Sequence, residues 1–221
     1  GVAGGYSTEG SNVMMLNCRS LADPEYLDDA YFPLAIDYAV TMGARIINMP
    51  IEAPYNQSLE STIHDYYQLN DIIFLGSYGN NNVGVNYPAK YDGVMAIGAS
   101  QSNADILNSP EYKWYSSPDD GSNYGMGLDF VAPGGLFVAD VTGSSGNYYA
   151  DYTFKTYWDF EQSVSTSRAV SFASGVVALV LSLYPCLHND EVEELLVRSA
   201  DKIGNYTYDG AGWCEEAGYG R

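Results

Sequence analysis

Two short segments carry side chains that can act together on a carbonyl group. Ser165-Thr166-Ser167 directly precedes a long apolar stretch with helical periodicity, and Asn80 follows a short apolar run. A serine at the start of a helix lies beside free backbone N–H groups at the positive end of the helix dipole, where a developing oxyanion is stabilised. An asparagine amide from a neighbouring strand end can supply a second donor. The Ser-Thr-Ser pattern is equally typical of a simple helix N-cap, and spacing by itself favours the N-cap.

A serine hydroxyl is a weak nucleophile unless a base takes its proton, so the two histidines of the chain are the first candidates. His188 follows the helix that Ser167 opens, and a helix of this length carries the chain roughly 25 Å, far beyond a hydrogen-bond reach of about 3 Å. His64 lies inside another predicted helix, and we interpret it as a solvent-facing or packing residue. Lys155 is the lysine nearest to Ser167 in the sequence, and no motif supports it as a base. We therefore expect this chain by itself to be inactive, or nearly so, as a hydrolase.

Short apolar runs alternate with helical patterns along the chain, which predicts an α/β fold. Near-continuous apolar strands between helices are typical of a mostly parallel sheet with helices on both faces, in three layers and one domain. In such sheets, ligands bind beyond the carboxyl ends of the strands, where Asn80 is expected. Polar stretches at residues 101–127 and 143–163 are interpreted as long surface loops. The predicted strands are residues 13–18, 45–49, 71–75, 94–99 and 128–132, and the predicted helices are residues 31–42, 59–69, 167–184 and 189–199.

Composition excludes several classes of protein. The chain has 221 residues, of which 46% are hydrophobic and 17% charged, and this balance excludes a disordered chain. Its net charge of −19 disfavours nucleic acid and anionic membrane surfaces as partners. No uninterrupted apolar run reaches about 18 residues, which argues against a membrane span. Three cysteines are too scattered for a zinc site; Cys186 and Cys214 either form a disulfide or remain free thiols.

Eight segments, in order and at similar spacing, resemble motifs of the subtilisin-like serine peptidases, the subtilase family. Each motif is weak by itself, but together they cover nearly the whole chain. The resemblance implies a subtilisin-like fold in which residues 1–221 form a partial peptidase domain, with the N-terminal part of the fold missing. It also implies a secreted or cell-surface protein that acts on peptide or protein substrates. The segments are residues 1–3 (GVAP in the family), 45–49 (VINMSLGG), 78–80 (AGN), 87–91 (YPAKY), 94–99 (VIAVGA), 131–134 (VAPG), 165–175 (GTSMAAPHVAG) and 218–221 (GYGR).

The resemblance assigns roles to individual residues. Ser167 falls on the nucleophile of the family, Asn80 on its oxyanion-hole asparagine, and Thr166 on a threonine that often supports that hole. The segments Pro50-Ile51-Glu52 and Ser77-Tyr78-Gly79 fall on the two extended segments that hold a peptide substrate by strand addition. In the family, the catalytic Asp and His come before the segment that residues 1–3 resemble, so the resemblance places both outside this chain.

Several positions depart from the family pattern. Ser165 replaces a glycine before Thr-Ser, and Glu52 and Ala53 stand where the family has Gly-Gly. Glu52 adds bulk and negative charge to the substrate segment, while Pro50 removes one N–H donor. These changes fit a non-catalytic peptide-binding or structural relative, and they equally fit an active enzyme with a preference for basic side chains facing Glu52. A third hypothesis is a two-part enzyme in which another polypeptide supplies Asp and His.

The resemblance requires no cofactor for the chemistry and allows Ca²⁺ as a structural ion. The carbonyls of Ala89, Tyr91 and Val94 match a weak cation site of the family. Asp119-Asp120-Gly121 is either a calcium loop or a turn, and we favour the turn. A sheet that lacks its first strands exposes an edge, so we also expect self-association.

Overall fold

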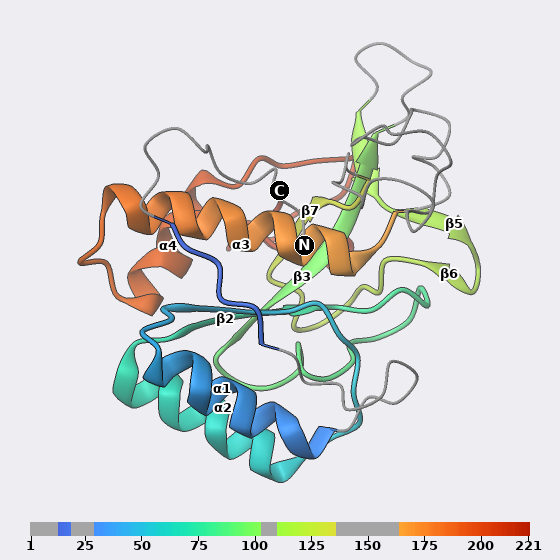
Figure 1. Cartoon of the computed structure of the whole chain (residues 1–221). Helices are drawn as coiled ribbons and strands as arrows, with labels where there is room; N and C mark the ends of the chain where they lie inside the picture. Colours follow the sequence, from blue (N-terminus) through green and yellow to red (C-terminus); the bar gives the residue numbers. More distant parts are fainter. Residues whose placement is uncertain (1–12, 19–28, 103–109, 136–163) are drawn as a thin grey trace, which may run out of the picture.

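The computed structural model describes residues 13–18, 29–102, 110–135 and 164–221 (Figure 1). Its centre is a five-stranded sheet in which β3 is paired on both sides, with β2 and then β1 on one side and β7 on the other. These four strands are parallel, and β4 adds antiparallel to the last residues of β3. The predicted mostly parallel sheet is therefore confirmed. The strands are β1 (Ile46–Met49), β2 (Ile73–Ser77), β3 (Val94–Ser102), β4 (Glu111–Lys113) and β7 (Phe130–Pro133).

Helices cover both faces of this sheet, which confirms the three-layer α/β architecture (Figure 1). The short 3-10 turn η1 (Asp29–Tyr31) leads into α1 (Phe32–Thr41), and α1 packs beside α2 (Gln57–Asn70) on one face. On the other face, α3 (Thr166–Leu183) packs across β1, β2, β3 and β7, and α4 (Asn189–Ser199) follows it.

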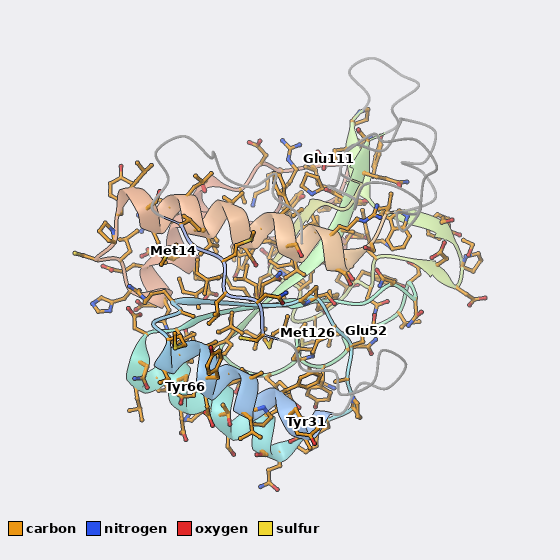
Figure 2. The ribbon with its side chains drawn as sticks, in the orientation of Figure 1. Met14, Tyr31, Glu52, Tyr66, Glu111 and Met126 are labelled. Atoms are coloured by element: carbon orange, nitrogen blue, oxygen red, sulfur yellow. The ribbon has the colours of Figure 1, made fainter. Side chains whose placement is uncertain are left out.

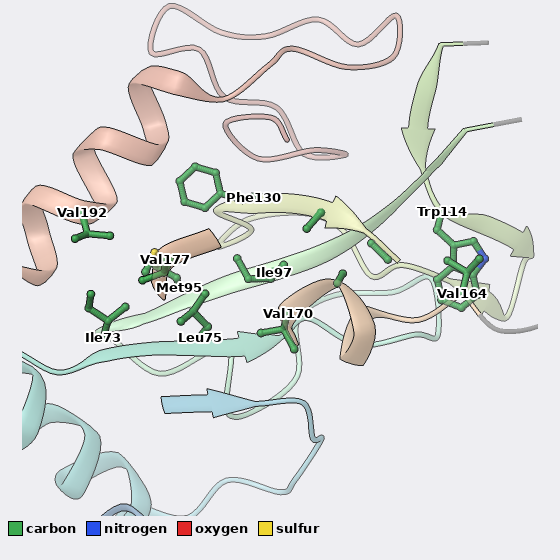
Figure 3. Close-up of a cluster of buried hydrophobic side chains, with 13 residues drawn as sticks. Ile73, Leu75, Met95, Ile97, Trp114, Phe130, Val164, Val170, Val177 and Val192 are labelled. Atoms are coloured by element: carbon green, nitrogen blue, oxygen red, sulfur yellow. The ribbon is translucent and has the colours of Figure 1, made fainter. Parts of the chain in front are cut away.

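β2 and the first part of β3 consist mostly of apolar residues because both of their faces are buried. Successive side chains of β2 point to opposite sides, so Leu75 packs under α3 while Phe74 packs toward α2. Figure 3 shows the core on the α3 side, where Val170 and Val177 of the helix lie over Leu75 and Ile97 of the sheet. This packing fixes the first turn of α3 relative to the carboxyl ends of the strands.

Among the described residues, α3 is the one helix that is long and apolar enough to cross a membrane. A single helix of this kind is weak evidence, because the core helix of a soluble protein has the same features. Ala169, Val170 and Val177 are fully buried against the sheet, so this side of the helix belongs to the core described above.

Residues 13–18, predicted as a buried strand, are not part of the sheet. Met14 is 95% exposed and Met15 is 67% exposed, and β1 pairs with β2 alone among the described residues. The prediction was wrong because an apolar run reports hydrophobicity and β-propensity but not whether a partner strand is present. Within the described part of the chain, the molecule therefore has both an exposed apolar segment and an unpaired side of β1.

The stretch 101–127, predicted as a surface loop, contains three short strands in its described part. After β4 the chain forms a hairpin of β5 (Tyr115–Ser117) and β6 (Asp120–Gly121), with Asp119 in the turn between them. Trp114, Ser122 and Asn123 are buried there. The polar and glycine-rich composition of this segment did not indicate these strands, because its buried side chains are mostly polar groups satisfied by hydrogen bonds. The predicted loop at 143–163, with Lys155, lies outside the described residues.

The three cysteines are free thiols, so the disulfide alternative between Cys186 and Cys214 is not realised in this structure. Cys214 is buried and Cys186 is exposed.

Candidate active site

The first turn of α3 and the end of β2 meet at the carboxyl edge of the sheet. Ser165 is the N-cap of α3, and its hydroxyl accepts a hydrogen bond from the backbone N–H of Arg168. The N-cap interpretation thus holds for Ser165, whereas Ser167 lies one residue inside the helix. Its backbone N–H belongs to the first turn, where helix geometry provides no internal acceptor. Its hydroxyl donates to the carbonyl oxygen of Pro50 at 3.1 Å.

Thr166 joins the helix start to Asn80. The backbone N–H and the hydroxyl of Thr166 both donate to Asn80 Oδ1, at 2.8 and 2.9 Å, and the Thr166 hydroxyl also accepts from the Gly79 N–H at 3.3 Å. Thr166 is fully buried. These bonds engage the oxygen of the carboxamide, so Asn80 Nδ2 is the end left to donate, and it has no acceptor in the described part of the chain. The structure thus brings Asn80, Thr166 and Ser167 together.

Asn123 holds the loop that carries Asn80, a role that the sequence did not reveal. Its side-chain oxygen accepts from the backbone N–H groups of Asn81 and Val83 at 2.9 and 3.0 Å. Its Nδ2 donates to the carbonyls of Tyr78 and Gly84 at 3.0 and 2.8 Å. All four hydrogen-bonding positions of this fully buried amide are therefore used.

Gly79 must be glycine in this arrangement. Its φ is +109°, and a Cβ there would lie 2.2 Å from Asn123 Nδ2. A side chain at this position would disrupt the clamp as well as strain the backbone.

Lys113 supports the same loop from the other side. Its amine donates to Asn82 Oδ1 at 2.6 Å and to the Ser122 carbonyl at 3.1 Å, and it lies 4.7 Å from the centre of the Tyr124 ring. Burial lowers the pKa of the Lys113 amine. These contacts place Lys113 in loop support, since its partners among the described residues are loop atoms and tyrosine rings and do not include Ser167.

The two predicted substrate segments lie against each other. Ser77 Oγ donates to the Ile51 carbonyl at 3.2 Å, and both Ser77 and Tyr78 expose none of their surface. The Tyr78 hydroxyl reaches the carbonyls of Gly125 and Met126 at 3.1 and 2.9 Å. Burial raises the pKa of that hydroxyl well above its ordinary value. Residues 77–79 are therefore called the inner wall of the predicted substrate site.

The segment Pro50-Ile51-Glu52 forms the outer wall. Pro50 and Ile51 are half-buried, whereas Glu52 is exposed. The next residue, Ala53, donates its N–H to the Tyr87 carbonyl at 3.0 Å, which attaches this wall to the loop before β3.

Neither histidine reaches Ser167. His188 precedes α4 at the far end of α3, and its Nδ1 lies 3.3 Å from Asp71 Oδ2. His64 is exposed on α2, in the layer on the opposite face of the sheet from α3. Within the described residues, no imidazole contacts the Ser167 hydroxyl.

A separate cavity of about 430 Å³ opens at the amino-terminal ends of β2 and β3. Ala89, Tyr91, Val94 and Asp129 are among the residues that line it. Asp129 Oδ2 accepts from the Ala96 N–H at 2.8 Å, and burial raises the pKa of Asp129 to about 7. Among the described residues, no three His, Cys, Asp or Glu side chains form a metal-binding group.

Comparisons with known proteins point to one family. The model of the subtilase family matches residues 12–220. The chain is 30% identical to the halolysin-like extracellular serine protease Nep of Natrialba magadii over 213 residues, covering 96% of this chain and 33% of that protein. It is 29% identical to subtilisin DY of Bacillus licheniformis over 182 residues, covering 80% of this chain and 57% of that protein. The chain thus spans between a third and somewhat over half the length of these relatives.

Solved structures show the same fold. A lanthipeptide protease superimposes with a TM-score of 0.65 at 22% identity, covering 92% of this chain and 66% of that one. Fervidolysin from Fervidobacterium pennivorans, a keratinolytic enzyme related to subtilisin, superimposes with a TM-score of 0.66 at 23% identity, covering 88% of this chain and 28% of that one. With the family match over residues 12–220, these findings establish that the chain belongs to the subtilase family.

Proposed function

We propose that this chain is the nucleophile-bearing part of a serine endopeptidase domain, with Ser167 as nucleophile and Asn80 as oxyanion donor. The observation that carries the proposal is the double hydrogen bond from Thr166 to Asn80 Oδ1. These bonds attach the side-chain oxygen of Asn80 to the helix turn that carries Ser167 and leave its amide nitrogen free to donate. The Ser167 N–H and Asn80 Nδ2 would then donate to the oxygen of a tetrahedral adduct, the arrangement that stabilises acyl transfer.

We also propose that the base of this reaction lies outside residues 1–221. The Ser167 hydroxyl donates to the Pro50 carbonyl, which cannot take up its proton. Without a base that accepts this proton, and a third group that orients the base, serine reactivity is low. The isolated chain should therefore be inactive or nearly so.

A fluorophosphonate probe, which reacts with activated serines, tests both statements. The chain should remain essentially unlabelled over the time in which a complete subtilase is labelled to completion. Adding the segment that precedes these residues in the parent gene should restore labelling, and Ser167→Ala should abolish it. Rapid stoichiometric labelling of the present chain would contradict the missing base. Labelling of the extended protein at a different residue would contradict the assignment of Ser167.

A non-catalytic relative, either peptide-binding or structural, is the second candidate, and one observation favours its structural form. Ser77 and Tyr78 expose no surface, and Ser77 bonds directly to Ile51 of the opposite wall. A peptide inserted between the walls would have to separate them. If the extended protein carries the Asp and His yet stays unlabelled, this second candidate is the correct one, and a lack of peptide binding would select its structural form.

We propose Ca²⁺ as a structural ion in the cavity lined by Ala89, Tyr91, Val94 and Asp129. Oxygen atoms are the ligands that Ca²⁺ prefers, and Asp129 supplies a carboxylate beside these main-chain segments. Bound Ca²⁺ would favour the ionised form of Asp129 and stabilise the fold. Calcium should therefore raise the Tm of the chain, and Asp129→Asn should abolish this increase. An equal rise in the variant would place the ion elsewhere.

The family and its relatives support two broader proposals. A peptide or protein is the expected substrate, and secretion or attachment to the cell surface is the expected location, since the relatives include an extracellular protease and a cell wall-associated protease. We further propose self-association through the edge of β1, whose outer side is unpaired among the described residues.

A further inference from the structure

The carboxylate of Glu52 stands at the end of the two walls that flank Ser167. Along the outer wall, Pro50 accepts from the Ser167 hydroxyl, Ile51 accepts from Ser77, and Glu52 follows. Glu52 Oε2 accepts from Asn86 Nδ2 at 3.0 Å. Since Asn86 precedes the residue that pairs with Ala53, this hydrogen bond joins the outer wall to the loop before β3. Figure 2 shows Glu52 on the side of the molecule toward which the parallel strands point.

The charge of Glu52 is not neutralised by the described part of the chain. None of the ion pairs found there includes Glu52, and its one side-chain partner is the neutral amide of Asn86. The nearby ammonium of Lys90 lies over the Tyr87 ring, 5.5 Å from its centre. An exposed carboxylate with one neutral donor retains free acceptor positions for a cationic ligand.

The backbone of Glu52 is available as well. Its N–H and carbonyl have no partner among the described residues, whereas the next N–H, that of Ala53, is bonded to Tyr87. A peptide that adds as a strand can therefore pair with the backbone at Glu52 while one of its side chains lies next to the carboxylate.

From these observations we infer that Glu52 is a specificity-determining residue that selects substrates with an arginine or lysine side chain at the position next to it. Arginine is preferred because its planar guanidinium forms two parallel hydrogen bonds with a carboxylate. The net charge of −19 adds general attraction for basic peptides. This inference rests on the proposed function, because it requires that peptides bind along Pro50-Ile51-Glu52.

A peptide-binding experiment tests the proposed selectivity of Glu52 without the need for catalysis. The chain is titrated into two fluorescein-labelled hexapeptides, Ala-Ala-Ala-Arg-Ala-Ala and the same peptide with citrulline, the uncharged isostere of arginine, at 0.15 M salt. Fluorescence anisotropy should show roughly fivefold tighter binding of the arginine peptide, as expected for one partly exposed charge pair. Glu52→Gln should bring the two affinities together by weakening only the arginine peptide.

The control variant is Glu60→Gln in the first turn of α2, which removes one exposed negative charge whose hydrogen-bond partner is the Tyr55 hydroxyl. It should keep the arginine preference, and so should Asn86→Ala, which removes the amide but leaves the Glu52 carboxylate. Equal affinity of the wild-type chain for the two peptides, or an equal loss of preference in Glu60→Gln, overturns the role of Glu52. Binding of neither peptide rejects the peptide groove of the proposed function, and the inference with it.

Discussion

Asn80 Oδ1 accepts two hydrogen bonds from Thr166, one from its backbone N–H at 2.8 Å and one from its hydroxyl at 2.9 Å. The two residues are 86 positions apart in the chain, on the loop after β2 and on the first turn of α3. One side chain thus satisfies an orphan N–H of the helix start and a fully buried hydroxyl. The opposite end of the same amide, Asn80 Nδ2, has no acceptor among the described residues.

Asn80→Leu should destabilise the fold, because it leaves both Thr166 donors without an acceptor. The expected loss in the free energy of unfolding is about 1–3 kcal/mol. Asn80→Asp, which keeps an acceptor oxygen for the two Thr166 donors, should lose markedly less. Urea denaturation of the three proteins measures the difference. Equal losses in the two variants would show that the hydrogen bonds to Thr166 are not the cause.

Asn123→Ala should lower the free energy of unfolding more than substitution of any exposed asparagine of the same loop. It removes an amide that makes four hydrogen bonds to the backbone of residues 78–84, with an expected loss of about 2–4 kcal/mol. The matched control is Asn81→Ala, whose side chain is exposed and should change stability by no more than about 0.5 kcal/mol. Denaturation midpoints compare the two, and similar midpoints would contradict the role of Asn123 as a clamp.

Asp129 should make the chain less stable as the pH rises toward neutrality. Burial raises its pKa from 3.8 to about 7, so between these values the folded chain keeps a proton that the unfolded chain has lost. The unfolding free energy contributed by this group therefore falls from pH 4 to pH 7 and is constant above that range. Asp129→Asn can still accept from the Ala96 N–H but does not titrate, so its stability should fall less over this interval.

Urea denaturation at several pH values between 4 and 8, without calcium, measures this slope. Asp119→Asn, in the exposed turn between β5 and β6, removes the same charge and should keep the wild-type slope. An unchanged slope in Asp129→Asn would exclude Asp129 as its source.

The apolar segment at residues 13–18 and the unpaired side of β1 should drive self-association. Sedimentation velocity of the chain should show a sedimentation coefficient that rises with protein concentration. The double substitution of Met14 and Met15 to Lys should lower this dependence, because Met14 is 95% exposed and Met15 is 67% exposed. Met126→Lys, at a residue 87% exposed elsewhere, is the control and should not. A wild-type chain that remains monomeric at all concentrations would contradict this expectation.

The order of the elements could be predicted from the sequence because, in most helices and strands, the spacing of apolar residues reflects which side chains are buried. The helix Asn189–Ser199 was predicted to the residue, and α3 to within one residue at each end. The strand at 71–75 was predicted two residues early, since the helix before it ends with Asp71 in the left-handed conformation, a backbone state that hydrophobicity does not encode. The segment at 13–18 failed because a strand requires a partner as well as apolar residues.

For the site, the sequence by itself determined the family and, through matching motifs, the candidate residues Ser167, Thr166 and Asn80. Only the tertiary structure decided how the Asn80 amide is oriented, that residues 77–79 are buried, and that Glu52 is bonded to Asn86. Motifs identify residues whose chemistry is local, such as a serine at a helix start. The orientation of a side chain depends on hydrogen bonds to residues distant in the chain, and Asn123 could not be singled out because nothing in its neighbourhood of the sequence indicates which backbone groups it meets.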